Sequence, residues 1–230
     1  MSAPPLPDSL LLDCAAGSAS PAIELLVATH LSMSEESRRL FAMMEAVGGA
    51  LLETLDDEPL ERISANAALS AVDEDGPGLD PWPARPALEL HGPRRRAPVG
   101  FRNDELPAPL QAIDAEIGGD RHWRRLGIGV AARKLGFDGD GERAHLLWAK
   151  GGTGIAHHRH VGREVVLVVK GAFWDDGVRY GPGDVAISED GTVHSPSIDD
   201  AEDCVCLAVT EAPVHFTGLA GLVLNRFARF

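Results

Sequence analysis

The sequence predicts an α+β chain in two parts, a small N-terminal helical domain followed by a small β-barrel. Over residues 1–74, apolar side chains recur at helical spacing behind residues that cap helices well. Eight prolines between positions 77 and 109 argue against long helices or central strands, and they indicate a linker over residues 75–105. Over residues 106–230, short β-rich segments alternate with Gly and Asp turn signals, which is typical of a sandwich or barrel.

The first two helices are indicated by their ends. Asp8 is expected to cap a short helix that Gly17 terminates, because glycine takes the left-handed conformation after a helix at little cost. Ser20 and Pro21 begin a second helix, with a capping hydroxyl followed by proline at the first helical position. We expect both helices to lie in the N-terminal domain.

A third helix is expected to begin near Ser34, where Glu35 and Glu36 suit the positive end of the helix dipole. Its apolar stripe comprises Leu40, Met43, Met44, Val47, Leu51 and Leu52. We interpret this stripe as a core face. The alternative is a pliable docking surface, because methionine adapts to different partners. A fourth candidate helix runs over residues 59–69.

The overall charge and the cysteine content restrict the function. A formal net charge of −14 argues against direct nucleic-acid binding, which needs a basic face, and suits docking onto a basic protein. No apolar run approaches the ~20 residues of a membrane span. The three cysteines, at positions 14, 204 and 206, make no disulfide framework. We therefore expect a cytoplasmic protein without a membrane partner.

The strongest chemical signal is a run of seven residues from His158 to Glu164. Alternate residues of a regular strand share a face, so His158, His160 and Glu164 are predicted to point together and His157 the other way. His194, which follows a predicted strand and turn, supplies a fourth ligand. Three imidazoles and a carboxylate predict one divalent metal, with zinc as the first choice and iron, manganese or nickel as alternatives.

Cys204 and Cys206 form a second candidate site. Side chains two apart in a strand face the same way, with Cα atoms about 6.5 Å apart, near the upper limit for a relaxed disulfide. The two cysteines are either small buried residues or an oxidisable pair whose reaction loosens the barrel. Their spacing leaves both interpretations open.

The paired histidine motifs resemble those of the cupin superfamily, in which the ligands face into a barrel called the double-stranded β-helix. Segments in both parts of the chain resemble the ChrR-type anti-sigma factors more specifically. These segments are 11–17, 27–31, 46–49, 106–110, 123–126, 171–173, 204–208 and 212–216. The resemblance covers nearly the whole chain apart from the linker.

This resemblance implies a regulator. The helical domain would bind an extracytoplasmic-function sigma factor and hide its polymerase-binding surfaces. The cupin would respond to an oxidative signal, such as singlet oxygen or an organic peroxide, and the cysteine pair is implicated in that response. The alternative hypothesis is a metal-dependent cupin oxygenase acting on a small chelating substrate. We prefer the regulator because no candidate general base is evident beyond the ligands. A homodimer formed through the cupin is a further hypothesis.

The N-terminal domain departs from the family at its zinc site. Family members hold a structural zinc through a first histidine and a His-x3-Cys-x2-Cys run. Here His30 remains, but Ser34 and Ser37 occupy the cysteine positions, and hydroxyls are poor zinc ligands. We predict no zinc in this domain. Ser34 would instead cap the third helix, and the domain would depend on its apolar stripe for stability.

Overall fold

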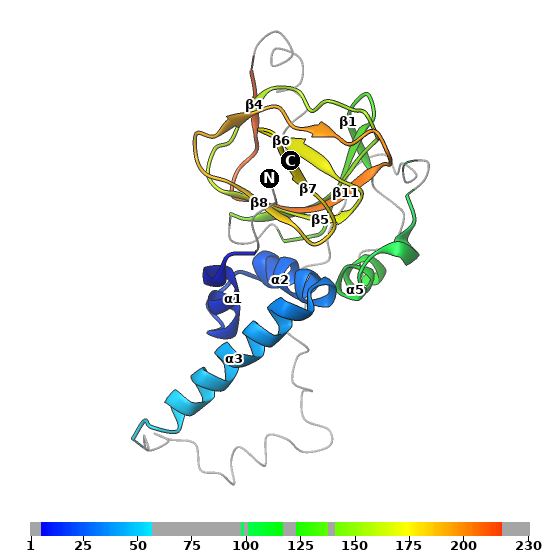
Figure 1. Ribbon diagram of the computed structural model, residues 1–230. Coiled ribbons are helices and arrows are strands. Elements are labelled where there is room, and N and C mark those ends of the chain that lie inside the picture. Colours follow the sequence, from blue (N-terminus) through cyan, green and yellow to red (C-terminus); the bar gives the residue numbers. More distant parts are fainter. Residues whose placement is uncertain (1–5, 57–97, 99–100, 117–122, 138–140, 218–230) are drawn as a thin grey trace, which may run out of the picture.

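The structure is a computed structural model that describes residues 6–56, 98, 101–116, 123–137 and 141–217 (Figure 1). It confirms the predicted fold class, with N-terminal helices followed by an antiparallel, sheet-rich barrel of the cupin type. The candidate helix over residues 59–69 lies outside the described residues, as does most of the predicted linker, so the domain boundaries remain predictions.

In the described N-terminal residues, 6–56, the helices are α1 (Asp8–Ala15), α2 (Pro21–Met33) and α3 (Glu35–Leu52). The predicted caps of the last two are confirmed. Ser20 Oγ accepts a hydrogen bond from the Ile23 backbone N–H at 3.3 Å, and Ser34 Oγ accepts one from the Ser37 N–H at 3.2 Å. Within the described part of the chain, no helix combines the length and the apolar character that crossing a bilayer requires.

The ends of α1 confirm one expectation and correct another. Gly17 has φ of +67° immediately after the helix, in the left-handed region, as expected. Asp8, however, is the first helical residue, and Pro7 occupies the capping position without a side-chain hydrogen bond. The predicted Asp8 cap is therefore wrong. Its carboxylate instead lies in the first turn, where the helix dipole favours a negative charge.

Over the described residues the strands form three antiparallel sheets. The larger has the order β1-β2-β3-β11-β5-β8, and the smaller ones have the orders β10-β6-β7 and β12-β4-β9. The strand bounds are β1 (Arg124–Gly127), β2 (Val130–Lys134), β3 (Arg143–Ala149), β4 (His158–Arg159), β5 (Glu164–Lys170), β6 (Phe173–Asp175), β7 (Val178–Tyr180), β8 (Val185–Ser188), β9 (Val193–His194), β10 (Ser197–Ile198), β11 (Cys204–Thr210) and β12 (His215–Phe216).

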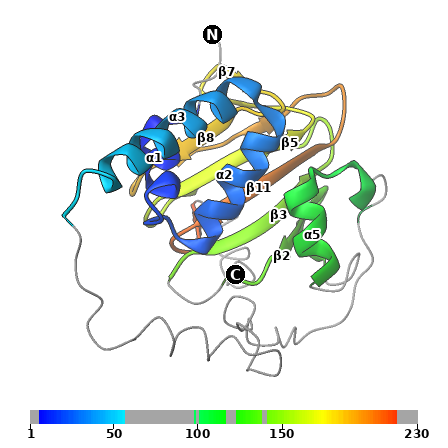
Figure 2. The ribbon, with the colours of Figure 1, turned by 90° about the horizontal axis from the view of Figure 1, so that it is seen from below.

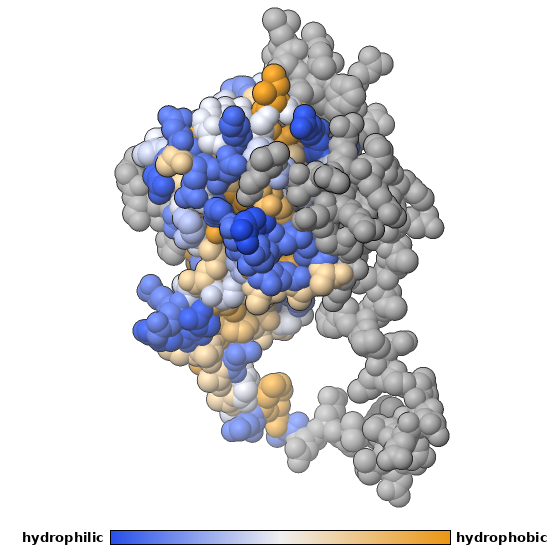
Figure 3. Space-filling model, turned by 90° about the vertical axis from the view of Figure 1, so that its right-hand side faces the viewer, coloured by the Kyte–Doolittle hydropathy of each residue, from blue (hydrophilic) through white to orange (hydrophobic). Residues whose placement is uncertain are grey.

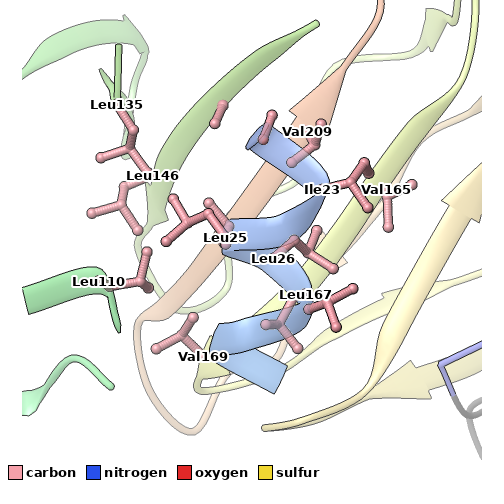
Figure 4. Packing of buried hydrophobic residues seen from close by; sticks show 14 of the residues in the cluster. Ile23, Leu25, Leu26, Leu110, Leu135, Leu146, Val165, Leu167, Val169 and Val209 are labelled. Atoms are coloured by element: carbon pink, nitrogen blue, oxygen red, sulfur yellow. The ribbon is translucent and has the colours of Figure 1, made fainter. Parts of the chain in front are cut away.

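Helix α2 lies across the outer face of the six-stranded sheet (Figure 2). Because strand side chains alternate between faces, Leu207 of β11 and Leu167 of β5 point outward, and both are fully buried. Leu26 of α2 packs into the same cluster with no exposed surface, next to Ile23 and Leu25 (Figure 4). Full burial of one leucine stabilises the fold by roughly 1.5–3 kcal/mol, so this contact joins the helices firmly to the barrel.

Helix α3 projects away from the barrel and contains no buried residue (Figure 1). Leu40 and Met44 pack partly against the core, but Met43 is 65% exposed and Leu51 62%. Apolar side chains are visible along this projecting part of the molecule (Figure 3). The predicted core face is therefore wrong for most of the helix. The periodicity correctly identified an apolar face, but it did not show what would cover that face.

A short helix, α5 (Ala108–Glu116), packs beside α2 after the turn η1 (Asn103–Glu105) (Figure 2). Pro107 directly precedes this helix, and its carbonyl accepts from the Leu110 and Gln111 N–H groups. Pro109 lies in the first turn, where proline fits because no backbone N–H is needed. A buried ion pair between Asp114 of α5 and Arg133 of β2 ties the helix to the sheet, and Asn103 Nδ2 donates to Asp114 at 2.6 Å. The last two prolines therefore begin a helix instead of extending the linker.

We expect Leu26→Ala to lower the free energy of unfolding by about 2–5 kcal/mol, because it leaves a cavity between α2 and the sheet. Urea denaturation checks this value when unfolding is monitored in the same experiment by a helix signal (far-UV circular dichroism) and by a tertiary-structure signal (tryptophan fluorescence). Both signals should shift together, since the helices and the barrel share one core. Leu51→Ala, at an exposed position of α3, is the matched control and should stay within about 0.5 kcal/mol of the parent. A loss of helix signal alone would contradict the shared core.

Candidate metal centre

Three of the four predicted ligands meet in the barrel. The Nε2 atom of His194 lies 2.8 Å from Nε2 of His160 and 2.9 Å from Nε2 of His158. One ring nitrogen from each of the three histidines falls within 4.8 Å of the others. His158 and His160 are buried, whereas His157 is exposed, as expected for a side chain on the opposite face.

Backbone pairing brings two of these histidines together. His158 of β4 is the direct register partner of His194 of β9. His160 follows β4, and its N–H donates to the Thr192 carbonyl at 2.9 Å, while its own carbonyl accepts from the Gly191 N–H at 3.1 Å. The segment 191–194 therefore holds both His158 and His160 in place through backbone hydrogen bonds.

The expectation of one regular strand from His158 to Glu164 is wrong. Strand β4 ends at Arg159, the chain turns at Gly162 with φ of +78°, and Glu164 begins β5 in the six-stranded sheet. Glu164 is still close to the histidines, with Oε2 3.7 Å from Nδ1 of His160. It thus lies beside the three-imidazole group and not within it, and it is the candidate for a fourth ligand.

Hydrogen bonds fix the proton positions of two rings. His158 Nδ1 lies 2.9 Å from the Ala156 carbonyl, and His194 Nδ1 lies 2.7 Å from Oδ2 of Asp175. A carbonyl or carboxylate oxygen only accepts, so each Nδ1 carries the proton and each Nε2 presents a lone pair. Asp175 was missed by the sequence analysis. Its only signal there is strand alternation, which places it on the same face as Phe173.

The electrostatics of the group suit a cation. Burial lowers the pKa of His158 and lowers that of His160 to about 4, so both rings are neutral at pH 7. Burial also raises the pKa of the Glu164 carboxyl to about 7. Two Nε2 lone pairs facing each other at 2.9 Å repel unless a proton or a metal ion lies between them.

The separation of the ring nitrogens also fits a metal. Ligands held 2.0–2.1 Å from one ion lie about 3 Å apart, close to the observed spacing. Three imidazoles with an adjacent carboxylate suit zinc, iron, manganese or nickel. When bound, such an ion supplies a positive charge and open coordination positions. The chain supplies the oriented Nε2 lone pairs of His158 and His194, with a ring nitrogen of His160 beside them.

Comparison with known proteins places this arrangement in a family. Residues 117–214 match the family described as the ChrR cupin-like domain. The chain is 36% identical over 222 residues to the anti-sigma-E factor ChrR of Cereibacter sphaeroides, covering 96% of both chains. The chain belongs to the ChrR family of anti-sigma factors. It also matches a chain in the crystal structure of Rhodobacter sphaeroides SigE in complex with the anti-sigma ChrR, with a TM-score of 0.68 and 33% identity over 90% of this chain and 97% of that one.

The position of the ChrR-type zinc run is occupied here by a chain of hydrogen bonds. Ser34 Oγ donates to Ser37 Oγ at 3.0 Å, and Ser37 Oγ lies 2.8 Å from Nε2 of His30. His30 is buried at the corner between α2 and α3, and burial lowers its pKa, so the ring is neutral and can accept from Ser37. The hydroxyls of Ser34 and Ser37 thus supply a partner for Nε2 of His30 without a thiolate. The absence of zinc in the helical part stays a prediction.

The Cys204–Cys206 pair lies inside the barrel, among Val168 and Phe173. The two Sγ atoms are 3.6 Å apart, and both residues are buried. The hydrogen bond to Cys204 and, to a smaller extent, burial raise the pKa of the Cys206 thiol well above its ordinary value. Because the thiolate is the reactive form, the Cys206 thiol is less reactive than an exposed one. A sensing role for the pair remains a prediction.

We expect added zinc to raise the melting temperature of the metal-free protein, and we expect His158→Ala to abolish the rise. An ion that binds only the folded state at 100 times its dissociation constant stabilises that state by about 2.7 kcal/mol. His157→Ala, one residue away and exposed, is the matched control and should respond as the parent does. Calorimetric melting with elemental analysis measures both effects. An equal response in both variants would contradict the proposed ligand set.

The helical part is expected not to gain stability from zinc. In the His158→Ala background, where the barrel site is disabled, saturating zinc should leave the melting temperature unchanged. Ser37→Ala should lower the free energy of unfolding by about 1–3 kcal/mol in that background, because it leaves the buried His30 Nε2 without its partner. A zinc-dependent rise that Ser37→Ala removes would show a metal site here.

Proposed function

We propose that this chain is a cytoplasmic anti-sigma factor that binds an extracytoplasmic-function sigma factor through its helical part. In this proposal the cupin barrel holds one divalent metal, zinc in the first instance, and an oxidative signal received by the barrel releases the sigma factor. Family membership supports the first half, because one relative is named an anti-sigma-E factor and a related chain was solved in complex with SigE.

The exposed apolar face of α3 is the observation that carries this proposal. Five large apolar side chains lie along it or just beyond its end, each between 59% and 69% exposed, namely Met43, Val47, Leu51, Leu52 and Leu55. A Cβ atom built at Gly48 or Gly49 would meet no atom within 4 Å, so the helix surface at these two glycines is open to a partner. A contiguous apolar surface of this kind, in an otherwise acidic protein, marks a protein-interaction site.

Acidic side chains surround this face, since Glu45 and Glu53 lie on or at the end of α3 and Asp56 follows it. The described part of α3 beyond Arg39 contains no basic residue to balance them. A partner that fits would present an apolar groove bordered by basic residues. A protein that binds nucleic-acid phosphates carries basic surface, so a sigma factor fits this description.

A series of polar contacts connects the barrel to the capping residue of α2, and it supports communication between the barrel and the proposed binding face. Arg163, in the turn between the ligand candidates His160 and Glu164, lies 3.9 Å from Glu142. Glu142 accepts a short hydrogen bond from the hydroxyl of Ser20, which caps α2. A change at the metal ligands therefore has a contiguous polar path to the helix that supports α3.

We expect the double substitution Val47→Asp/Leu51→Asp to weaken binding of the sigma factor encoded beside this chain by at least 30-fold, because it places two charges in the apolar contact. The matched control is Ile128→Asp/Ile187→Asp, which adds the same charge at exposed barrel positions and should change affinity less than threefold. Titration calorimetry under reducing conditions measures both. Unchanged affinity in the α3 variant, or equal losses in both, would contradict this surface.

A further inference from the structure

Asp175 contacts the metal centre from a strand that carries no predicted ligand. It ends β6, where alternation turns Phe173 and Asp175 inward and leaves Trp174 outside, 42% exposed. Its Oδ2 atom lies 2.7 Å from Nδ1 of His194. Only 18% of the Asp175 side chain and 8% of the His194 side chain are exposed, so little water competes for this hydrogen bond.

His194 depends on this bond more than His158 depends on its own. The Nδ1 atom of His158 bonds to the carbonyl of Ala156, which belongs to the same chain segment and moves with it. His194 lies on the two-residue strand β9, and its Nδ1 has a side-chain acceptor from a different sheet, 19 residues earlier in the chain. The backbone thus places the Cα of His194, but the orientation of its ring is set by Asp175.

We propose that Asp175 is a positioning residue for the metal centre, holding His194 as the Nδ1–H tautomer with Nε2 directed at the ion. This inference rests on the proposed metal site. The carboxylate behind His194 also makes the imidazole more basic and adds a negative charge near the ion, which favours a divalent cation. Removal of such a partner typically weakens metal binding 10–100-fold.

Other contacts hold the hairpin that carries Asp175, so removal of the Asp175 carboxylate need not unfold the barrel. Trp174 Nε1 donates to Asp199 at 3.2 Å, and Arg179 Nε donates to the same carboxylate at 3.0 Å. Inside the barrel, the rings of Phe173 and Tyr180 stack with centroids 4.9 Å apart. None of these contacts uses Asp175.

The neighbouring Asp176 provides a matched control for the charge. It is exposed, and its φ of +46° lies in the left-handed region that asparagine tolerates. Asp176→Asn therefore removes the same charge from the same hairpin without touching His194. Asp175→Asn removes the charge but keeps an acceptor oxygen, and Asp175→Ala removes both.

Zinc affinity of the full-length, metal-free chain, measured by competition against a chromophoric chelator, tests the proposal. We expect 10–100-fold weaker binding for Asp175→Asn, a larger loss for Asp175→Ala and a change below twofold for Asp176→Asn. Long-range ¹H–¹⁵N correlation of the imidazoles should show the Nδ1–H tautomer of His194 in the parent and in Asp176→Asn, and a mixture in Asp175→Ala.

Parent-like zinc affinity and an unchanged His194 tautomer in Asp175→Ala would overturn the proposal. So would a parent protein that binds no zinc, and that result would remove the metal centre as well. Sigma-factor affinity measured on the same samples distinguishes a failure of the positioning role of Asp175 from a failure of the proposed anti-sigma function. Loss of zinc affinity in Asp175→Asn, with sigma binding unchanged under reducing conditions, supports the positioning role whatever the signal that the barrel receives.

Discussion

The packing of α2 against the six-stranded sheet is the contact on which the rest of this molecule depends. Leu26, Leu167 and Leu207 lose all contact with water at this interface, and α1 and α5 pack beside the same helix. Helix α3 has no buried residue, so its position in space is set by its contacts with α1 and α2 and by the partly buried side chains of its first half. Helix α1, which contacts both α2 and α3, and the His30–Ser37–Ser34 hydrogen bonds join these two helices.

The candidate metal centre ties the barrel together in a comparable way. His158 and His194 belong to the sheet that contains β4 and β9, and His160 directly follows β4. Glu164 comes from the six-stranded sheet, and Asp175 comes from the sheet that contains β6. An ion held there would connect all three sheets through side chains. Loss of the ion would remove that connection beside the turn of Arg163, close to the cap of α2. The candidate metal centre thus lies beside a series of polar contacts that ends at the cap of α2.

Local features of the sequence predicted local structure well. Ser20 and Ser34 cap their helices because capping needs only a hydroxyl and the next three residues. The convergence of three histidines was also predictable, since His158, His160 and His194 meet as their spacing suggested. Their role as metal ligands stays a prediction. Longer-range features were not. The apolar period of α3 could not show that the sheet would pack against α2 instead, and nothing near His194 in the sequence points to Asp175. The turn at Gly162 replaced the expected regular strand because Glu164 belongs to a different sheet.

The central claim is that the exposed face of α3 is the surface that holds the sigma factor. Hydrogen exchange of the full-length chain, with and without its sigma factor, tests this claim most directly, because a projecting helix with little burial exchanges its amides readily. The account predicts that exchange slows across Glu35–Leu52 in the complex, while the strands of the six-stranded sheet keep their rates. Slower exchange confined to the barrel, with α3 unchanged, would contradict it.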